Sequence, residues 1–253
     1  MHILKELDWI ILTLPGGIME ELRRTESLSR SASVASIYMR HVYNWMTLGL
    51  IVTALAAWFT AGSETLLMLI FGNGVIGMIV MAVAVIALPM VLAGAIHKLS
   101  AAAATAIFLV YSVLMGMFLS SVLLIYTGAS VFSAFAITAG TFAGMSLYGT
   151  VTKRDLSGMG SFMIMGLWGV ILAAIVNIFL QNTMLEFVIS ALSVIIFTGL
   201  TAYDTQRLRA FGEGMPLDDG TAIRRGALLG ALELYLDFIN LFIAILRIVG
   251  DRR

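Results

Sequence analysis

Long apolar stretches recur along this chain and are separated by short polar connections. Seven of them approach the roughly 20 residues that a helix needs to cross a bilayer. They cover 42–60, 75–96, 101–126, 129–149, 161–180, 184–204 and 228–249. Lipid offers no hydrogen-bond partner to an open backbone, so each stretch must be helical. The pattern predicts an all-α polytopic membrane protein, with a seven-helix transmembrane domain at 40–253 after an N-terminal segment at 1–39.

Composition supports a membrane protein and excludes other classes. Hydrophobic residues make up 60% of the chain and charged residues 12%, unlike the balance of a soluble enzyme. The chain contains no cysteine, so it forms neither a disulfide framework nor a thiolate metal site. The apolar stretches fill nearly all of the sequence after residue 40 and leave no room for a second, soluble domain.

Basic residues are distributed unequally between alternate connections. Lysine and arginine precede the first stretch and occur in every second connection after it, whereas 61–74, 127–128 and 181–183 contain neither. The positive-inside rule then predicts a cytoplasmic N-terminus. Seven crossings place the C-terminus outside, where Arg252 and Arg253 are unexpected. A re-entrant last stretch would remove this conflict, but the stretch is long enough to cross and we expect a crossing.

Three other patterns predict local structure. Apolar residues at helical spacing in 3–14 predict a short helix at the membrane interface. Glycine and proline in the polar connection 207–227 predict irregular structure. Two runs of small residues at four-residue spacing predict close helix packing inside the bundle, rather than a dimer interface. These runs are Ala136, Gly140 and Gly144, and Gly226 and Gly230.

Two aspartates, Asp204 and Asp237, lie inside stretches that otherwise suit only lipid. An ionised carboxylate near the centre of a spanning helix costs roughly 2.5 to 3.5 kcal/mol, so we expect water, a cation or a proton beside each. Glu233 and Asn240 share one helix face with Asp237, because they lie four residues before it and three after it. If the last two helices are neighbours, Asp204 and Asp237 face each other in the cytoplasmic half of the membrane.

Two facing carboxylates in a low dielectric cannot both stay ionised, and we expect the pair to share a proton. When ionised, the same oxygens suit a hard divalent cation, so the sequence predicts transient calcium binding at Asp204 and Asp237. The alternatives are a static hydrogen-bonded pair, or an Asp204 that reaches the interface and is held there by Arg207.

Motifs of enzymes and of cofactor sites do not occur in the sequence. The three histidines, His2, His41 and His97, are each isolated, and neither His-Glu-x-x-His nor Gly-x-Ser-x-Gly is present. We therefore expect no enzyme activity. We also expect no resident cofactor and no nucleic-acid partner, with calcium only as a permeant ion.

The chain closely resembles the Bax-inhibitor family of transmembrane proteins. The two signature segments of that family are matched by TAYDTQ at 201–206 and LELYLDFINLF at 232–242. Its bacterial branch is matched by HVYNWM at 41–46, SLYG at 146–149, KRDL at 153–156 and VNIFL at 176–180. The resemblance runs from about residue 36 to 250.

This resemblance implies a fold and a function. The fold is a seven-helix bundle of the bacterial inner membrane with the last helix central. The function is a pH-sensitive calcium leak controlled by an aspartate pair, which the motifs place on Asp204 and Asp237. Family members also carry a basic residue from the second span that latches onto one aspartate. Here the candidates for that latch are Lys98 and Arg207.

We therefore expect a calcium leak channel gated by Asp204 and Asp237, with Glu233 and Asn240 lining the path. Its partners would be the lipid bilayer, calcium and protons. The alternative is a regulatory membrane protein that transports nothing and modulates a membrane-anchored AAA protease complex or membrane-protein quality control. The polar segment 20–35 would then be a regulatory cytoplasmic tail rather than a solvated leader.

Overall fold

Helices make up almost all of the chain that the structure describes. The computed structural model describes residues 16–72, 74–96, 98–215 and 220–253, so the interfacial helix expected at 3–14 and the isolated His97 lie outside it. The described part contains eight helices and no extended strand. They are α2 (Gly16–Ala61), α3 (Glu64–Phe71), α4 (Val75–Ala95), α5 (Ala101–Ile125), α6 (Gly128–Val151), α7 (Ser157–Leu180), α8 (Thr183–Glu213) and α9 (Gly220–Val249).

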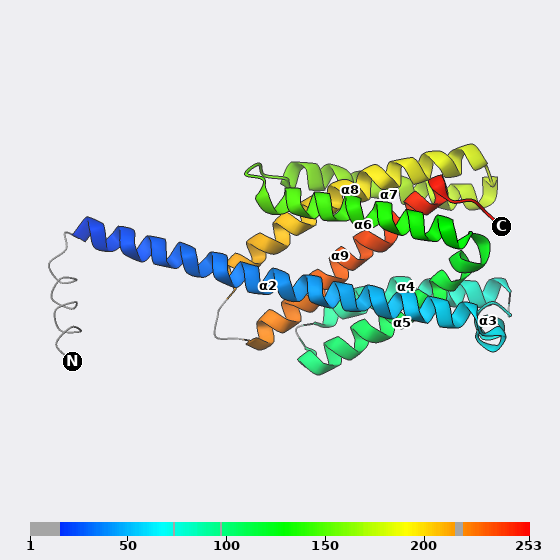
Figure 1. Ribbon diagram of the computed structural model, residues 1–253, viewed down its shortest axis with the longest axis horizontal. Coiled ribbons are helices and arrows are strands. Elements are labelled where there is room, and N and C mark those ends of the chain that lie inside the picture. The colour runs from blue at the N-terminus through cyan, green and yellow to red at the C-terminus, as the bar shows by residue number, and fades with distance from the viewer. Residues whose placement is uncertain (1–15, 73, 97, 216–219) are drawn as a thin grey trace.

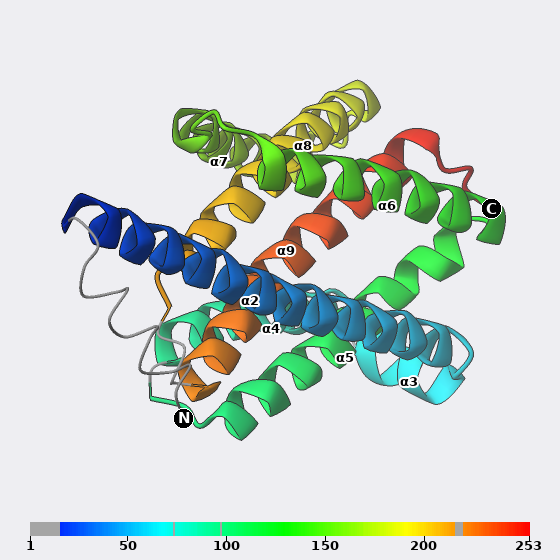
Figure 2. The same ribbon diagram turned by 60° about the vertical axis from the view of Figure 1, so that its left-hand side comes forward.

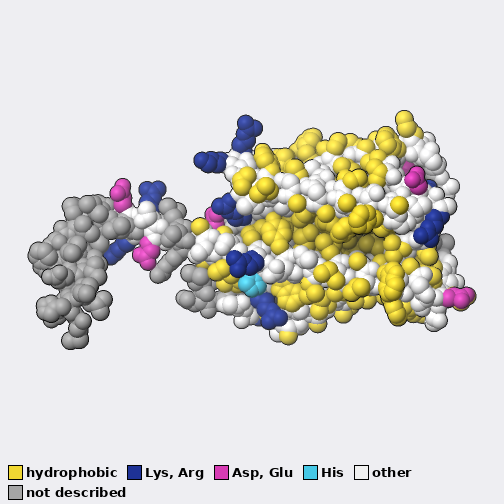
Figure 3. Space-filling model, viewed as in Figure 1, with side chains coloured by type: hydrophobic (Ala, Val, Ile, Leu, Met, Phe, Trp, Pro, Cys, Tyr) yellow, Lys and Arg dark blue, Asp and Glu magenta, His cyan; other side chains and the backbone are white. Residues whose placement is uncertain are grey.

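Most of these helices are long and apolar enough to cross a membrane. Six of them, α2 and α5 to α9, meet both criteria within the described residues. The seventh expected crossing, α4, has 21 residues, of which Ile79–Ala95 form a shorter apolar helix. Figure 3 shows hydrophobic side chains over the middle of the bundle and charged side chains toward its two ends. The chain is an all-α polytopic membrane protein, as predicted.

The last helix, α9, runs through the centre of the bundle. Figure 2 shows it passing between α2 and α5 on one side and α6 and α8 on the other. In its most apolar window 67% of the residues are buried, compared with at most 39% in the other spanning helices. The central position of the last helix was expected from the family resemblance.

Side-chain caps fix where several helices begin. Ser63, Ser100, Thr127 and Asn182 each precede a helix and accept a hydrogen bond from the backbone N–H three residues later. These side chains satisfy N–H groups that have no partner inside the helix. The short polar connections therefore contain the signals that start α3, α5, α6 and α8.

The first helix, α2, is one unbroken element of 46 residues. It continues through the predicted boundary at residue 40, and its polar N-terminal part projects beyond the bundle (Figure 1). Among its described side chains, the first buried ones are Val34 and Ala35. Ala35 and Tyr38 lie so close to Gly212 of α8 that a Cβ there would be 2.8 Å from the Tyr38 ring. The bundle packing of α2 thus begins at about Val34.

The expectation of irregular structure in the connection 207–227 was wrong for most of its described residues. This connection is helical at 207–213 and 220–227, because α8 continues to Glu213 and α9 already begins at Gly220, whereas 216–219 lie outside the described residues. Arg209 and Glu213 form an ion pair one helical turn apart, 3.4 Å between Nε and Oε1, which suits a helix leaving the membrane. In addition, the connection 61–74 contains the unexpected short helix α3.

The two runs of small residues behave differently. Gly226 and Gly230 are buried, and a Cβ on Gly230 would lie 2.9 Å from the Tyr38 hydroxyl, so their predicted close packing is confirmed. Gly140 and Gly144 are exposed and have no atom within 4 Å of an added Cβ. The prediction for α6 was therefore wrong, because spacing alone does not distinguish a packed face from a lipid-facing one.

The C-terminal residues 250–253 form a clasp against the corner between α5 and α6. The Thr127 N–H donates to the Asp251 carbonyl over 3.1 Å, and the Arg253 N–H donates to the Ile125 carbonyl over 2.9 Å. Arg252 pairs with Glu186 at 3.1 Å. This C-terminal clasp lies at the end of the bundle whose connections lack lysine and arginine. The last helix is therefore one continuous helix of 30 residues, long and apolar enough for the crossing that we expected.

Candidate functional site

Four charged side chains meet between the antiparallel helices α8 and α9. Asp204 shares a side-chain hydrogen bond with Asp237. One helical turn closer to the end of the bundle whose connections contain lysine and arginine, which we call the arginine-rich end, the Arg207 guanidinium Nη2 lies 2.6 Å from Glu233 Oε2. The same nitrogen lies 3.0 Å from Asp204 Oδ1. The contact between Asp204 and Asp237 was expected from their positions on neighbouring helices.

Exposure falls along this group from the ion pair to the aspartate pair. The Arg207 and Glu233 side chains are 45% and 41% exposed, whereas that of Asp204 is 13% exposed. Asp237 is 6% exposed, and its Oδ2 is buried with no hydrogen-bond partner among the described residues. A carboxylate has no proton to donate, so a hydrogen bond between two carboxyl groups requires a proton on one of them. The contact between the two aspartates therefore requires at least one proton on the pair.

Apolar side chains fill the bundle beyond Asp237. Phe238 contacts Phe135 and Phe142 edge to face, with ring centroids 5.6 and 5.5 Å apart. Farther along α9, Leu241 and Phe242 are buried in a cluster with residues of α6, α7 and α8. The polar group thus opens toward the arginine-rich end of the bundle and is sealed from the other end.

Contacts from α6 and α7 fix the position of α8 around Asp204. Gly149 of α6 lies against the Ala202 carbonyl, where an added Cβ would be 2.3 Å from the oxygen. The Gln206 side chain accepts a hydrogen bond from the Leu156 N–H over 2.9 Å and donates to the Arg154 carbonyl over 2.8 Å. The family-like segments 146–149, 153–156 and 201–206 therefore meet in space, although they are far apart in sequence.

The connection between α6 and α7 carries its own cap. The Ser157 N–H donates to Asp155 Oδ1 over 2.9 Å at the start of α7. Hydrogen bonds from Ser157 lower the pKa of the exposed Asp155 carboxyl below its ordinary value. Sequence reasoning did not identify Asp155 or Gln206 as residues that hold the site, since polar residues at a helix end are common wherever helices leave a membrane.

The other predicted site residues lie in different places. The Asn240 side-chain amide donates to the Leu236 carbonyl of its own helix over 2.8 Å, so it does not extend the charged group. Lys98 is exposed in the turn between α4 and α5 and forms no ion pair with any described residue. Arg207 contacts Asp204 and also lies over the Tyr203 ring, 5.4 Å from its centroid. Of the two candidate latch residues, only Arg207 contacts an aspartate.

The charged group combines three carboxyl side chains with one guanidinium. The described residues contain no group of three or more His, Cys, Asp or Glu side chains arranged to hold a metal ion. Asp204 and Glu233 both contact Arg207, which already supplies positive charge at this place.

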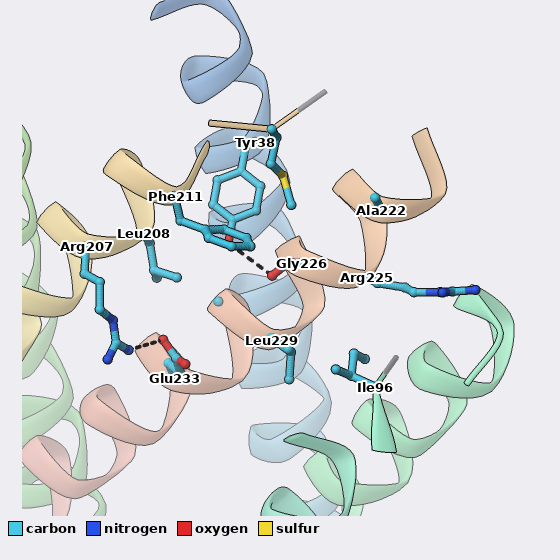
Figure 4. Close-up of a pocket in the computed structure, with 12 residues that line it drawn as sticks. Tyr38, Ile96, Arg207, Leu208, Phe211, Ala222, Arg225, Gly226, Leu229 and Glu233 are labelled. Carbon is cyan, nitrogen blue, oxygen red and sulfur yellow. Dashed lines mark hydrogen bonds and ion pairs between the residues drawn. The ribbon is translucent and has the colours of Figure 1, made fainter. Parts of the chain in front are cut away.

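A pocket of about 440 Å³ adjoins the Arg207–Glu233 pair. Figure 4 shows the pair on one side of it and the Tyr38 side chain above, where the hydroxyl donates to the Gly226 carbonyl over 3.1 Å. We call it the inner pocket; its lining is Tyr38, Ile96, Arg207, Leu208, Phe211, Met215, Ala222, Arg225, Gly226, Leu229, Gly230 and Glu233. Sequence reasoning did not predict it.

Comparisons with known proteins agree with this fold and these motifs. Residues 35–253 match the family model described as inhibitor of apoptosis-promoting Bax1. The inner membrane protein YbhL of Escherichia coli is 47% identical over 237 residues, which are 93% of this chain and 100% of YbhL. An uncharacterized protein of Borreliella burgdorferi is 47% identical over 85% of this chain and 92% of its own length. One of Deinococcus radiodurans is 39% identical over 92% of this chain and 98% of its own length. A match of this length places the chain in the Bax inhibitor-1-like family.

Proposed function

We propose that this chain is a pH-sensitive leak channel of the bacterial inner membrane that passes calcium and is gated by Asp204 and Asp237. The location follows the name of the similar E. coli protein. The observation that carries the gate is the buried carboxyl pair, whose side chains contact each other and whose Asp237 oxygen Oδ2 has no partner among the described residues. Low dielectric makes the charge of such a pair depend strongly on its proton.

The proposed gate works through the number of charges between α8 and α9. With one proton, the pair is joined by a hydrogen bond and holds the two helices together. Without that proton, two negative charges repel each other across the same contact and attract a divalent cation. Arg207, which bridges Asp204 and Glu233, offsets part of this charge at the exposed end of the site.

Calcium flux into dye-loaded proteoliposomes tests the gate. Asparagine has the shape of a protonated aspartic acid and cannot ionise. We therefore expect Asp237→Asn to show, at every pH between about 5 and 8, the flux that the wild type approaches at the acidic end. The control is Glu64→Gln, which neutralises an exposed acidic residue at the start of α3, away from the site. A pH dependence of Asp237→Asn equal to that of the wild type would refute the role of the pair.

A second function, regulation of a membrane protease without transport, is favoured by one observation. The part of α2 before Val34 projects from the bundle (Figure 1), and side chains described there, such as Glu20, Glu21 and Arg23, are exposed. They form a surface that a protein partner could contact. Deletion should stop at residue 31, because Val34 and Ala35 are buried in the bundle. A leak channel lacking 1–31 should keep its calcium flux, whereas a tail-mediated regulator should lose its effect on proteolysis.

A further inference from the structure

The inner pocket has walls suited to an apolar ligand. Seven of its lining side chains are hydrophobic and come from α2, α8, α9 and the connections that follow α4 and α8: Tyr38, Ile96, Leu208, Phe211, Met215, Ala222 and Leu229. Its volume of about 440 Å³ falls in the range of roughly 300 to 1,000 Å³ that is usual for ligand sites. The pocket lies beside the proposed gate but contains neither Asp204 nor Asp237.

Arg225 gives this apolar pocket a positive charge, and no ion pair joins it to any described residue. Its Nε–H is buried and has no acceptor among the described residues. Figure 4 shows its guanidinium directed away from the Arg207–Glu233 pair. Glu233, the acid that lines the pocket among the described residues, already contacts Arg207 at 2.6 Å. A buried guanidinium N–H without an acceptor is costly, so this position favours an anionic ligand.

The pocket lies at the end of the bundle where basic residues gather. Lys98, two residues after the pocket-lining Ile96, is exposed. Arg224, which precedes Arg225, lies over the Trp45 ring, 5.8 Å from its centroid. Basic residues at one end of a membrane protein face the cytoplasmic leaflet and its anionic headgroups. An occupant of this pocket is therefore both apolar along most of its length and negatively charged at one end.

We propose that the inner pocket binds one anionic phospholipid of the cytoplasmic leaflet. The phosphate would accept hydrogen bonds from Arg225, and part of one acyl chain would lie among Tyr38, Leu208 and Leu229. Since α8 and α9 line both the pocket and the aspartate pair, a bound lipid would bridge the helices that the gate separates. The binding itself does not depend on the leak activity.

Native mass spectrometry of the purified full-length protein tests the proposal with three probes: phosphatidylglycerol, zwitterionic phosphatidylethanolamine and inorganic phosphate. We expect the wild type to retain one phosphatidylglycerol saturably, to retain phosphatidylethanolamine more weakly, and to keep the lipid when phosphate is added. Arg225→Gln should weaken phosphatidylglycerol binding by roughly tenfold or more, as expected for loss of a charge-assisted hydrogen bond. The matched control Arg224→Gln removes the same charge one residue away and should change binding by no more than about twofold.

A second variant keeps both arginines and changes only the space. Leu229→Trp fills the pocket, so it should also abolish the single tight lipid, provided that the variant elutes and melts as the wild type does. If Arg225→Gln does not fold, Arg225→Lys and Leu229→Trp decide the question.

Several results would overturn the proposal. They are equal losses in Arg224→Gln and Arg225→Gln, equal binding of both phospholipids, displacement of the lipid by inorganic phosphate, and unchanged binding in Leu229→Trp. The first would indicate diffuse surface charge, and the third a site for free phosphate. None of these measurements involves calcium flux, so the proposal fails or stands separately from the leak channel.

Discussion

Replacing Arg207 with glutamine removes the one cation that joins α8 to α9 beside the aspartate pair in the described structure. Its Nη2 lies 3.0 Å from Asp204 Oδ1 and 2.6 Å from Glu233 Oε2. At the effective dielectric constant of about 20 found near protein surfaces, each contact corresponds to roughly 5 to 6 kcal/mol of Coulomb attraction. The Arg207 and Glu233 side chains are nearly half exposed, so solvent and desolvation cancel most of this attraction.

The net contribution lies between two limits. Exposed pairs contribute about 0 to 1 kcal/mol, while removing one partner of a buried pair costs about 3 to 5 kcal/mol. For a pair that joins a half-exposed cation to the nearly buried Asp204, we expect about 2 kcal/mol. That energy corresponds to roughly a 30-fold shift between closed and open populations. Arg207→Gln should therefore increase calcium leak at neutral pH by up to about 30-fold.

The assay is calcium flux into proteoliposomes, with protein content and orientation matched between variants. Arg207→Lys keeps the charge but loses the planar guanidinium, so it should give an intermediate leak. Arg224→Gln is the control for charge at the same end of the bundle. If the bridge acts as a unit, the effects of Arg207→Gln and Glu233→Gln should not add in the double variant. A folded Arg207→Gln protein that leaks no more than the wild type at any pH would refute the reasoning.

Three further predictions concern stability, measured by thermal unfolding in detergent. Gly149→Ala should destabilise the protein by about 1 to 3 kcal/mol, because the added Cβ would meet a backbone oxygen of α8. Gly144→Ala on the same helix should not destabilise it. Equal shifts in melting temperature for the two variants would contradict the packing of α6 on α8. Tyr235→Phe loses a buried 2.6 Å hydrogen bond to a threonine of α2 and should cost about 1 kcal/mol, whereas Tyr111→Phe removes a buried hydroxyl with no partner in the described structure and should be neutral or stabilising. Arg252→Gln breaks a largely exposed ion pair and should cost less than about 1 kcal/mol, with the difference vanishing at high salt.

The sequence predicts those site residues whose charged side chains carry a high free-energy cost in lipid. A charged residue inside an apolar stretch needs a partner, and this reasoning brings Asp204 and Asp237 together before any coordinates are known. The spacing of Glu233 and Asp237 places both on the face toward α8, where the structure has them. The roles of these residues in gating remain predictions.

The parts that sequence misses are those whose signal is ambiguous. Gln206 holds α8 to the start of α7, but a glutamine at a helix end also suits water. Gly144 and Gly230 follow the same four-residue spacing, yet one faces lipid and the other packs against Tyr38. Lipid is as apolar as the protein interior, so an apolar pattern does not separate these two faces. For the same reason, a polar sequence such as 20–35 does not show whether it continues a helix into water.

The C-terminal clasp places a pivot at one end of α9. Hydrogen bonds hold Asp251 and Arg253 to the corner between α5 and α6, so a tilt of the central helix would turn about this end. Asp237 lies 12 residues from Val249, which is about 18 Å along the axis at 1.5 Å per residue. A tilt of only about 5° about the clasp would displace Asp237 by roughly 1.6 Å, more than a hydrogen bond tolerates. A small rotation of the helix would therefore break the contact between the two aspartates. The same rotation would displace Gly220, at the other end of α9, more than twice as far.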